Sequence, residues 1–235
     1  MTSAQNGDSR YADILGSLRM FRSVPSAAVR DLEKKLVFTR HGTGSVLYRQ
    51  GERASGILFV FEGRIKLWAN TMDTKTALLK VAGPGEILGL AAVMAGKPHL
   101  TTAQVTMPSL TALLRAEQLA SAIRKCPQLA EAAAEWVALE YKECAMDMLL
   151  LRVPCSSSQR LAAALVRLAN SGMTARSGPA TLTYTHSELG QLIGASRETV
   201  TRLMKRLERQ GVITTKHSTV QINEPRTLIE LARLS

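Results

Sequence analysis

The chain has 235 residues, which is enough for one or two domains with sizeable hydrophobic cores. Its formal net charge of +11, from 30 Lys and Arg against 19 Asp and Glu, favours a polyanionic partner, either nucleic acid or an anionic membrane surface. Because no apolar run reaches the roughly 18 residues of a membrane span and the N-terminus has no apolar signal-peptide core, we expect a cytoplasmic protein with no membrane partner.

The pattern from Phe38 to about Leu114 consists of short β-branched or aromatic runs punctuated by glycine. Many short strands with turn signals between them are typical of an antiparallel roll or barrel, so these residues alone predict a small all-β domain. The strand candidates are 45–48, 56–61, 64–68, 76–81, 104–106 and 110–114.

A long helix follows Pro127 and carries apolar residues at alternating spacings of three and four. This spacing is the seam of a coiled coil and predicts pairing with a second helix. The alternative is a helix buried within its own monomer. The seam consists of Leu129, Ala132, Trp136, Leu139, Glu143, Met146 and Leu150.

A proline and three serines within residues 152–158 indicate a hinge. We therefore predict an N-terminal segment with an all-β domain over residues 1–127, a pairing (dimerisation) helix with hinge over 128–158, and a separate C-terminal domain over 159–235. Within the last of these, an amphipathic helix over 159–170 and a brief strand over 182–184 precede two further helices.

Those two helices are predicted from capping signals. Thr185 and Glu188 form a capping box that starts the first helix, and Gly194 supplies the turn after it. Ser196 is a good N-cap for a second helix running to about Gln210. A small hairpin wing is expected from the apolar residues at 212–213 and 220–222.

The second helix separates its residues by face. Val200, Leu203 and Leu207 recur at helical spacing and are expected to be buried. A basic, polar set of residues lies on the opposite face and suits the major groove of DNA, where Arg recognises guanine and Glu accepts from cytosine. The alternative is an ordinary solvated face. This polar set consists of Arg197, Glu198, Thr201, Arg202 and Lys205.

SRETVTRLMKRLERQGVI, residues 196–213, resembles the recognition helix and following strand of the CRP/FNR family of bacterial transcription regulators. GSVLYRQGERASGILFVFEGRIKLW, residues 44–68, resembles the cyclic-nucleotide-binding β-roll of that family. The resemblance implies an α+β fold with an N-terminal antiparallel β-roll (double-stranded β-helix), a long dimerisation helix and a C-terminal winged helix-turn-helix.

The resemblance also implies a homodimer that reads a DNA palindrome with half-sites close to TGTGA or TTGAT, with RNA polymerase as a further partner. Base edges would be read by Arg197, Glu198 and Arg202, with Thr201 beside them where the family varies. The expected phosphate contacts are Thr185, His186, Ser196, Thr199 and Lys205.

The cassette that holds cyclic AMP in relatives departs from the family pattern here. Leu90 stands where the ribose-binding Glu is expected, and His99 where the phosphate-binding Arg is expected. Ala145 and Met146 replace the hydroxyls that reach adenine. We therefore expect DNA binding that is constitutive or gated by another small ligand or a redox signal. The candidate pocket residues are Glu86, Gly89, Leu90, Lys97, His99, Thr102 and Met146.

Other effectors and activities follow less directly from the sequence. Lys97, His99 and Thr102 offer a small-anion site, while haem bound through His41, His99 or the cysteines is a less favoured alternative. The cysteines Cys126, Cys144 and Cys155 have no zinc spacing, so we expect structural thiols, no metal and no cofactor. No catalytic constellation stands out, which argues against an enzyme. A regulatory module that controls a partner protein without binding DNA is the alternative function.

Overall fold

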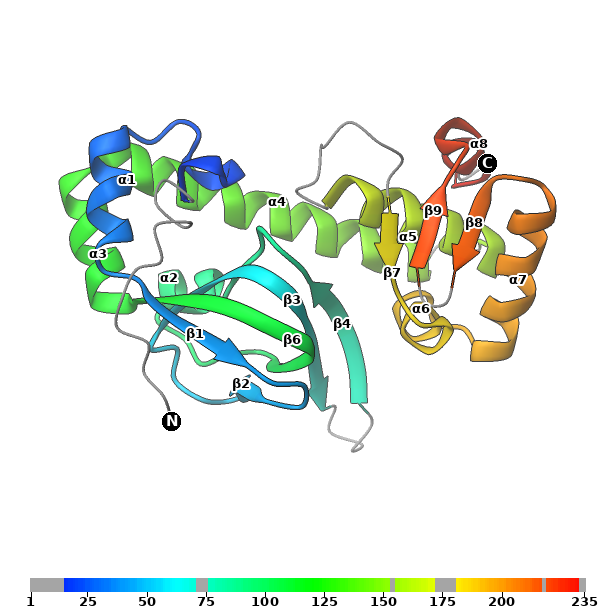
Figure 1. Cartoon of the computed structure of the whole chain (residues 1–235), viewed down its shortest axis with the longest axis horizontal. Helices are drawn as coiled ribbons and strands as arrows, with labels where there is room; N and C mark the ends of the chain where they lie inside the picture. The colour runs from blue at the N-terminus through cyan, green and yellow to red at the C-terminus, as the bar shows by residue number, and fades with distance from the viewer. Residues whose placement is uncertain (1–14, 71–75, 153–154, 172–180, 217–218, 233–235) are drawn as a thin grey trace. The chain divides into compact units, whose positions relative to one another are not determined.

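The computed structural model describes residues 15–70, 76–152, 155–171, 181–216 and 219–232 (Figure 1). The chain divides into two compact units, residues 1–142 and 143–235, and the boundary falls within helix α4. Each unit is described by itself. Within the described ranges, no helix is both long and apolar enough to cross a membrane.

The N-terminal unit is built on an antiparallel sheet with the strand order β1-β6-β3-β4, while β2 pairs with β6 and β5 pairs with β3. This arrangement confirms the predicted antiparallel roll. The strands are β1 (Val37–His41), β2 (Val46–Tyr48), β3 (Gly56–Asn70), β4 (Thr76–Ala82), β5 (Ile87–Leu88) and β6 (Thr102–Arg115).

Two pairs of predicted short strands are each one long strand. Residues 56–61 and 64–68 both belong to β3, and residues 104–106 and 110–114 both belong to β6. Gly63, which suggested a turn, has a φ of 86°, and its surroundings leave no room for a Cβ next to Ser109. The pairing of β3 with β6 shifts register on both sides of this glycine. Gly63 therefore permits an irregularity within a continuous strand.

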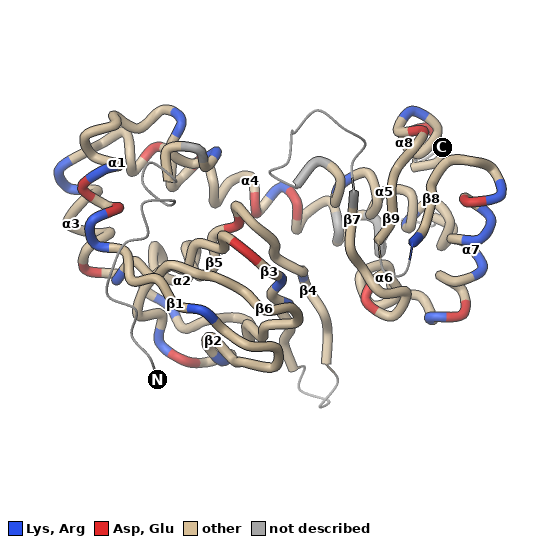
Figure 2. The backbone as a smooth tube through the Cα atoms, viewed as in Figure 1, with Lys and Arg blue, Asp and Glu red and all other residues tan. Residues whose placement is uncertain are grey.

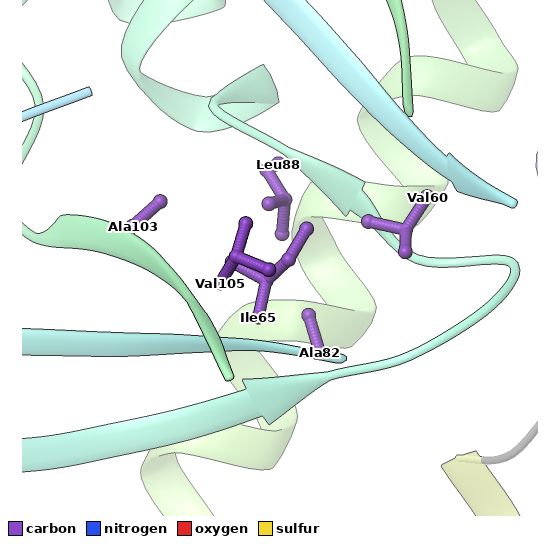
Figure 3. Packing of buried hydrophobic residues seen from close by; sticks show 6 residues of the cluster. All are labelled: Val60, Ile65, Ala82, Leu88, Ala103 and Val105. Atoms are coloured by element: carbon purple, nitrogen blue, oxygen red, sulfur yellow. The ribbon is translucent and has the colours of Figure 1, made fainter. Parts of the chain in front are cut away.

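The core of the roll is formed by small and branched side chains that meet between the strands (Figure 3). Burying these apolar groups provides the main driving force for closing the sheet. Leu47, Tyr48, Leu58 and Leu67 pack around the cluster and are partly buried. The cluster consists of Val60, Ile65, Ala82, Leu88, Ala103 and Val105.

Helices precede and follow the strands of this unit along the chain. Helix α4 begins at Pro127, as the proline predicted. Helix α2 was not predicted, because it is only six residues long; it lies between Gly89 and Gly96, which both adopt left-handed backbone conformations. The helices are η2 (Leu15–Ser17), η3 (Arg19–Phe21), α1 (Ser26–Glu33), α2 (Leu90–Ala95), α3 (Ala116–Lys125) and α4 (Pro127–Arg152).

The C-terminal unit combines a three-stranded sheet, ordered β7-β9-β8, with helices that pack around α5. The hairpin of β8 and β9 confirms the predicted wing, and β7 adds a third strand to it. The elements are α5 (Ser157–Ser171), β7 (Thr181–Thr183), α6 (His186–Ile193), α7 (Arg197–Arg209), β8 (Ile213–Lys216), β9 (Thr219–Ile222) and α8 (Pro225–Ala232).

Candidate nucleic-acid interface

The two helices α6 and α7 begin where their capping residues predicted. The Thr185 hydroxyl accepts from the Glu188 N–H at 3.1 Å, and the Thr185 N–H donates to the Glu188 carboxylate at 2.8 Å. The Ser196 hydroxyl accepts from the Thr199 N–H at 3.1 Å. Gly194 ends α6 with a φ of 63°. Local sequence signals therefore fix this helix-turn-helix.

Two residues that the sequence analysis did not single out hold the helix-turn-helix together. A Cβ at Gly190 would lie 2.6 Å from the carbonyl oxygen of Ala195, so the turn passes too close for any larger residue. Arg160 of α5 donates from Nε to the carbonyl oxygen of Ile193 at 2.8 Å. It thereby satisfies a carbonyl at the C-terminal end of α6 that the helix itself leaves unpaired.

Helix α7 buries one face and exposes the other, as predicted. Val200, Leu203 and Leu207 are buried, and Met204 joins them. The opposite face forms an open groove, and Figure 2 shows Lys and Arg along this helix. The groove is lined by Arg197, Glu198, Thr201, Arg202, Lys205 and Arg209. The five residues of the predicted reading face are thus brought together.

Glu198 is the single acidic residue that lines this groove. Its pKa is lowered chiefly by a hydrogen bond from its own backbone N–H, then by the Ser196 side chain and by the positive charge of Arg197. The side chain is therefore an ionised acceptor at neutral pH. A carboxylate among guanidinium groups can accept from cytosine while its neighbours recognise guanine.

Four of the predicted phosphate contacts lie at the starts of α6 and α7, while Lys205 lies further along α7. Thr185 and Ser196 use their hydroxyls in capping. Ser196 Oγ also lies 3.2 Å from Thr199 Oγ1, so the two hydroxyls are hydrogen-bonded to each other. His186 Nδ1 lies 2.8 Å from Thr201 Oγ1, so Nε2 is the ring nitrogen that remains for a phosphate contact.

The wing is tied to the C-terminal end of α7. Glu208 accepts from the Thr215 backbone N–H at 3.1 Å and from the Thr215 hydroxyl. The Asn223 amide donates to the carbonyl oxygen of Gly211 at 3.1 Å. These contacts hold the β8–β9 hairpin against the helix that carries the reading face.

The cassette of the N-terminal unit places the predicted effector residues in two kinds of environment. Leu90 is fully buried, and Glu86 forms an ion pair with Lys80 at 2.6 Å. Glu86 is therefore engaged elsewhere. Lys97 is exposed, and Met146 belongs to the other unit. Within the described part of this unit, Gly89 lies against His99, and Thr102 contacts Gln50.

His99 is buried and stacks on Tyr48, with the ring centroids 3.7 Å apart and the rings 12° from parallel. Its backbone N–H donates to the Glu52 carbonyl at 2.9 Å, and its carbonyl accepts from the Gly51 N–H at 2.8 Å. Gly89 lies so close that a Cβ there would be 3.0 Å from His99 Cε1. Thr102 Oγ1 accepts from the Gln50 N–H at 3.0 Å.

The stacked pair is electrically neutral at physiological pH. Burial lowers the pKa of His99, and the nearby negative charge of Glu52 opposes that effect. Burial also raises the pKa of Tyr48 to about 12; a hydrogen bond with Thr101 opposes this, and the charge of Glu140 adds to it. The cassette therefore presents an aromatic stack where an anion-binding site would need a cation.

His41, one of the candidate haem ligands, has Nε2 3.0 Å from Thr111 Oγ1. Within the described ranges, no group of three or more His, Cys, Asp or Glu is placed to hold a metal ion. Cys126 is buried, Cys155 is half-buried and Cys144 is exposed.

The predicted seam of α4 changes its exposure along the helix. Leu129 and Ala132 are buried within their own protomer, while Trp136, Leu139 and Glu143 are half-buried. The Leu150 side chain lies outside the described residues. Toward the C-terminal end, large apolar side chains are exposed: Tyr141 (74%), Met146 (47%), Met148 (61%) and Leu149 (51%).

Comparison with known proteins agrees with both units. Residues 39–126 match the cyclic nucleotide-binding domain family, and residues 159–231 match the Crp-like helix-turn-helix domain family. The chain is 30% identical over 190 residues to the Cyclic AMP receptor protein of Thermus thermophilus, covering 80% of this chain and 85% of that protein. It belongs to the CRP/FNR family.

Other relatives extend this similarity. The CRP-like cAMP-activated global transcriptional regulator of Mycobacterium tuberculosis is 25% identical to this chain. The alignment covers 94% of this chain and 99% of that regulator. The structure of FixK2 from Bradyrhizobium japonicum has the same fold, with a TM-score of 0.75, 20% identity and coverage of 85% of this chain and 98% of FixK2. The chain is thus a DNA-binding transcription regulator of this family rather than an enzyme. The alternative of a regulatory module without DNA binding loses its basis.

Proposed function

We propose that the protein is a homodimer that reads a DNA palindrome with half-sites close to TGTGA or TTGAT without requiring cyclic AMP. The reading face of α7 supports the first part, because Arg197, Glu198 and Arg202 line one open groove. Two such helices about 34 Å apart would enter successive major grooves on one face of DNA.

Backbone contacts would position each half of the dimer on the duplex. Thr199 lies in the first turn of α7, whose N-terminus offers backbone N–H groups and a favourable dipole to a phosphate. Lys205 is exposed on the same helix and supplies positive charge. Such contacts carry no sequence information but make affinity depend steeply on salt.

Dimerisation through α4 is supported by its heptad spacing together with the exposure of its apolar side chains. Leu129 and Ala132 are already covered within the protomer, so a second copy would pack from about Trp136 onward. Met146 is the most exposed seam residue that the structure describes. An exposed apolar side chain at a seam position favours a partner helix packed against it.

Independence from cyclic AMP rests on the stacked pair of His99 and Tyr48. The family pattern implies a Glu for the ribose and an Arg for the phosphate, and this chain has a buried Leu90 and a neutral, stacked His99 there. A neutral ring cannot balance the charge of a cyclic phosphate. We therefore infer that DNA binding is constitutive or responds to another small ligand or a redox signal. We also propose RNA polymerase as a partner of the DNA-bound protein.

Arg202→Ala and Lys205→Ala test the assignment of the reading face. Arg202→Ala should relax the preference for the palindrome over scrambled DNA, because a good base contact provides about 1–3 kcal/mol of discrimination. Lys205→Ala should weaken both DNAs alike and reduce the slope of log affinity against log salt by about one. Anisotropy titrations at several salt concentrations measure both quantities. Equal losses on palindromic and scrambled DNA for Arg202→Ala would contradict the assignment.

A further inference from the structure

Thr201 lies within the reading groove, and its hydroxyl is engaged by two neighbours. It donates to the carbonyl oxygen of Arg197, one turn earlier in α7, at 2.9 Å. His186 Nδ1, at the start of α6, lies 2.8 Å from Thr201 Oγ1. These contacts join the recognition helix to the helix that precedes it.

The direction of the second hydrogen bond follows from the first. A hydroxyl carries one proton, and Thr201 has already given it to the Arg197 carbonyl. His186 must therefore carry its proton on Nδ1 and donate it to Thr201 Oγ1. The oxygen is held against α6 and the preceding turn of α7. The γ-methyl group is the substituent of Thr201 that remains for the groove, which Thr201 lines together with Glu198 and Arg202.

We propose that Thr201 reads a thymine through its γ-methyl group, with His186 as a positioning residue that holds the hydroxyl away from the bases. A threonine methyl makes a favourable apolar contact with the C5-methyl of thymine, a group that only thymine presents in the major groove. The hydroxyl cannot donate to thymine O4 or to guanine, because its proton is already used. This inference rests on the proposed function and names the chemical group that is read.

The test compares thymine with uracil, which lacks only the C5-methyl group. Thymines of the palindrome are replaced by deoxyuridine one position at a time, symmetrically in both half-sites, and affinities are measured by fluorescence anisotropy. The wild-type protein should lose affinity at one position by about fourfold per half-site, the factor expected for one buried methyl group. Replacements at positions away from Thr201 should have little effect.

Two variants, one isosteric and one smaller, separate the methyl group from the hydroxyl. Thr201→Val keeps the methyl group and loses the hydroxyl, so it should still prefer thymine at that position. Thr201→Ser keeps the hydroxyl and loses the methyl group, so it should bind thymine and uracil equally. The reverse pattern, or a wild-type protein that is insensitive to uracil at every position, would overturn the inference.

His186 is tested by the same ratio of affinities for thymine and uracil DNA. His186→Ala should lower this ratio, because it releases the Thr201 oxygen to rotate and hydrate, and His186→Asn should restore it by supplying a side-chain donor. An unchanged ratio in His186→Ala would overturn the positioning role. Scrambled DNA is the control for the proposed function: if wild type does not prefer the palindrome, the proposed function fails, whereas a preference with the wrong uracil pattern defeats this inference alone.

Discussion

His99 illustrates how one residue changes the chemistry of a conserved architecture. The family resemblance implies a phosphate-binding Arg at this position, whereas the His99 side chain is buried against Tyr48 and Gly89. Burial of an imidazole disfavours its charged form. A ring that is neutral in the folded protein must take up a proton when the protein unfolds in acid, which links this residue to stability.

We expect the N-terminal unit to lose stability as pH falls through 6.5, the ordinary pKa of histidine. The folded pKa of His99 is lowered, so between that value and 6.5 the unfolded chain binds more protons. The contribution of neutral His99 to the free energy of unfolding is fully present above pH 6.5 and is lost as pH falls toward the folded pKa. His99→Phe keeps a stacking ring without titrating, so its stability should decline less between pH 7.5 and 5.5.

Urea unfolding followed by tryptophan fluorescence measures this effect, because both tryptophans, Trp68 and Trp136, lie in the N-terminal unit. The pKa of His41 is also lowered by burial, and it is retained in both proteins, so the difference between their pH profiles isolates His99. Parallel profiles would show that His99 is not the titrating group.

At the scale of single residues, the sequence predicted contacts between residues that are close along the chain and missed contacts between residues that are far apart along it. Thr185 with Glu188 and Ser196 with Thr199 were predictable, because capping joins residues three apart. His186 was expected only to touch phosphate, and its contact with Thr201 joins two helices. Tyr48 and His99 are 51 positions apart, and only the closed roll brings them together.

At the scale of elements, the helix-turn-helix depends on the close approach of α6 to the turn that follows it. Gly190→Ala should destabilise the C-terminal unit by about 1–3 kcal/mol, the usual cost of forcing extra atoms into a packed site. The added Cβ would meet the backbone oxygen of Ala195, which cannot move as a side chain can. DNA affinity should fall with it, because α7 is displaced relative to α6.

Thermal unfolding followed by circular dichroism measures this change, and Gln191→Ala is the control. Gln191 is exposed and is the next residue of the same helix. Its replacement by alanine adds no atom and should leave stability and DNA binding nearly unchanged. A Gly190→Ala protein as stable as the Gln191→Ala protein would show that the turn can relax.

Elements were predictable where periodicity or capping was strong, as in α4, α6 and α7. The strands were broken too often, because glycine was interpreted as a turn signal. Gly63 instead lies inside the continuous strand β3, where it permits irregular pairing with β6. The two-residue β5 and the six-residue α2 were missed because segments this short carry no usable period.

For the whole molecule, the seam of α4 distinguishes two exposed methionines. Met146→Glu should shift the protein toward monomers, because it would place a charge between two packed helices. Met148→Glu is a matched control: Met148 is exposed on the same helix but lies off the seam. Sedimentation equilibrium over a range of concentrations measures the dimer constant. A loss of dimer with Met148→Glu alone would assign pairing to a different face of α4.

The order of the parts was predictable from composition and from two specific motifs, and both family matches agree with it. Which small molecule, if any, controls DNA binding was not predictable in the same way. The cassette is recognisable by its position in the chain, whereas its ligand depends on a few side chains such as Leu90 and His99 that differ from the family pattern.

The most direct test is an anisotropy titration of purified, ligand-free protein on a palindrome with TGTGA half-sites and on scrambled DNA, with and without cyclic AMP. A TTGAT palindrome is measured in parallel. We predict that one palindrome is bound specifically without cyclic AMP and that adding the nucleotide does not change its affinity, because the stacked His99 and Tyr48 occupy the cassette. Weak, unspecific binding that becomes tight and specific only on addition of cyclic AMP would contradict this account.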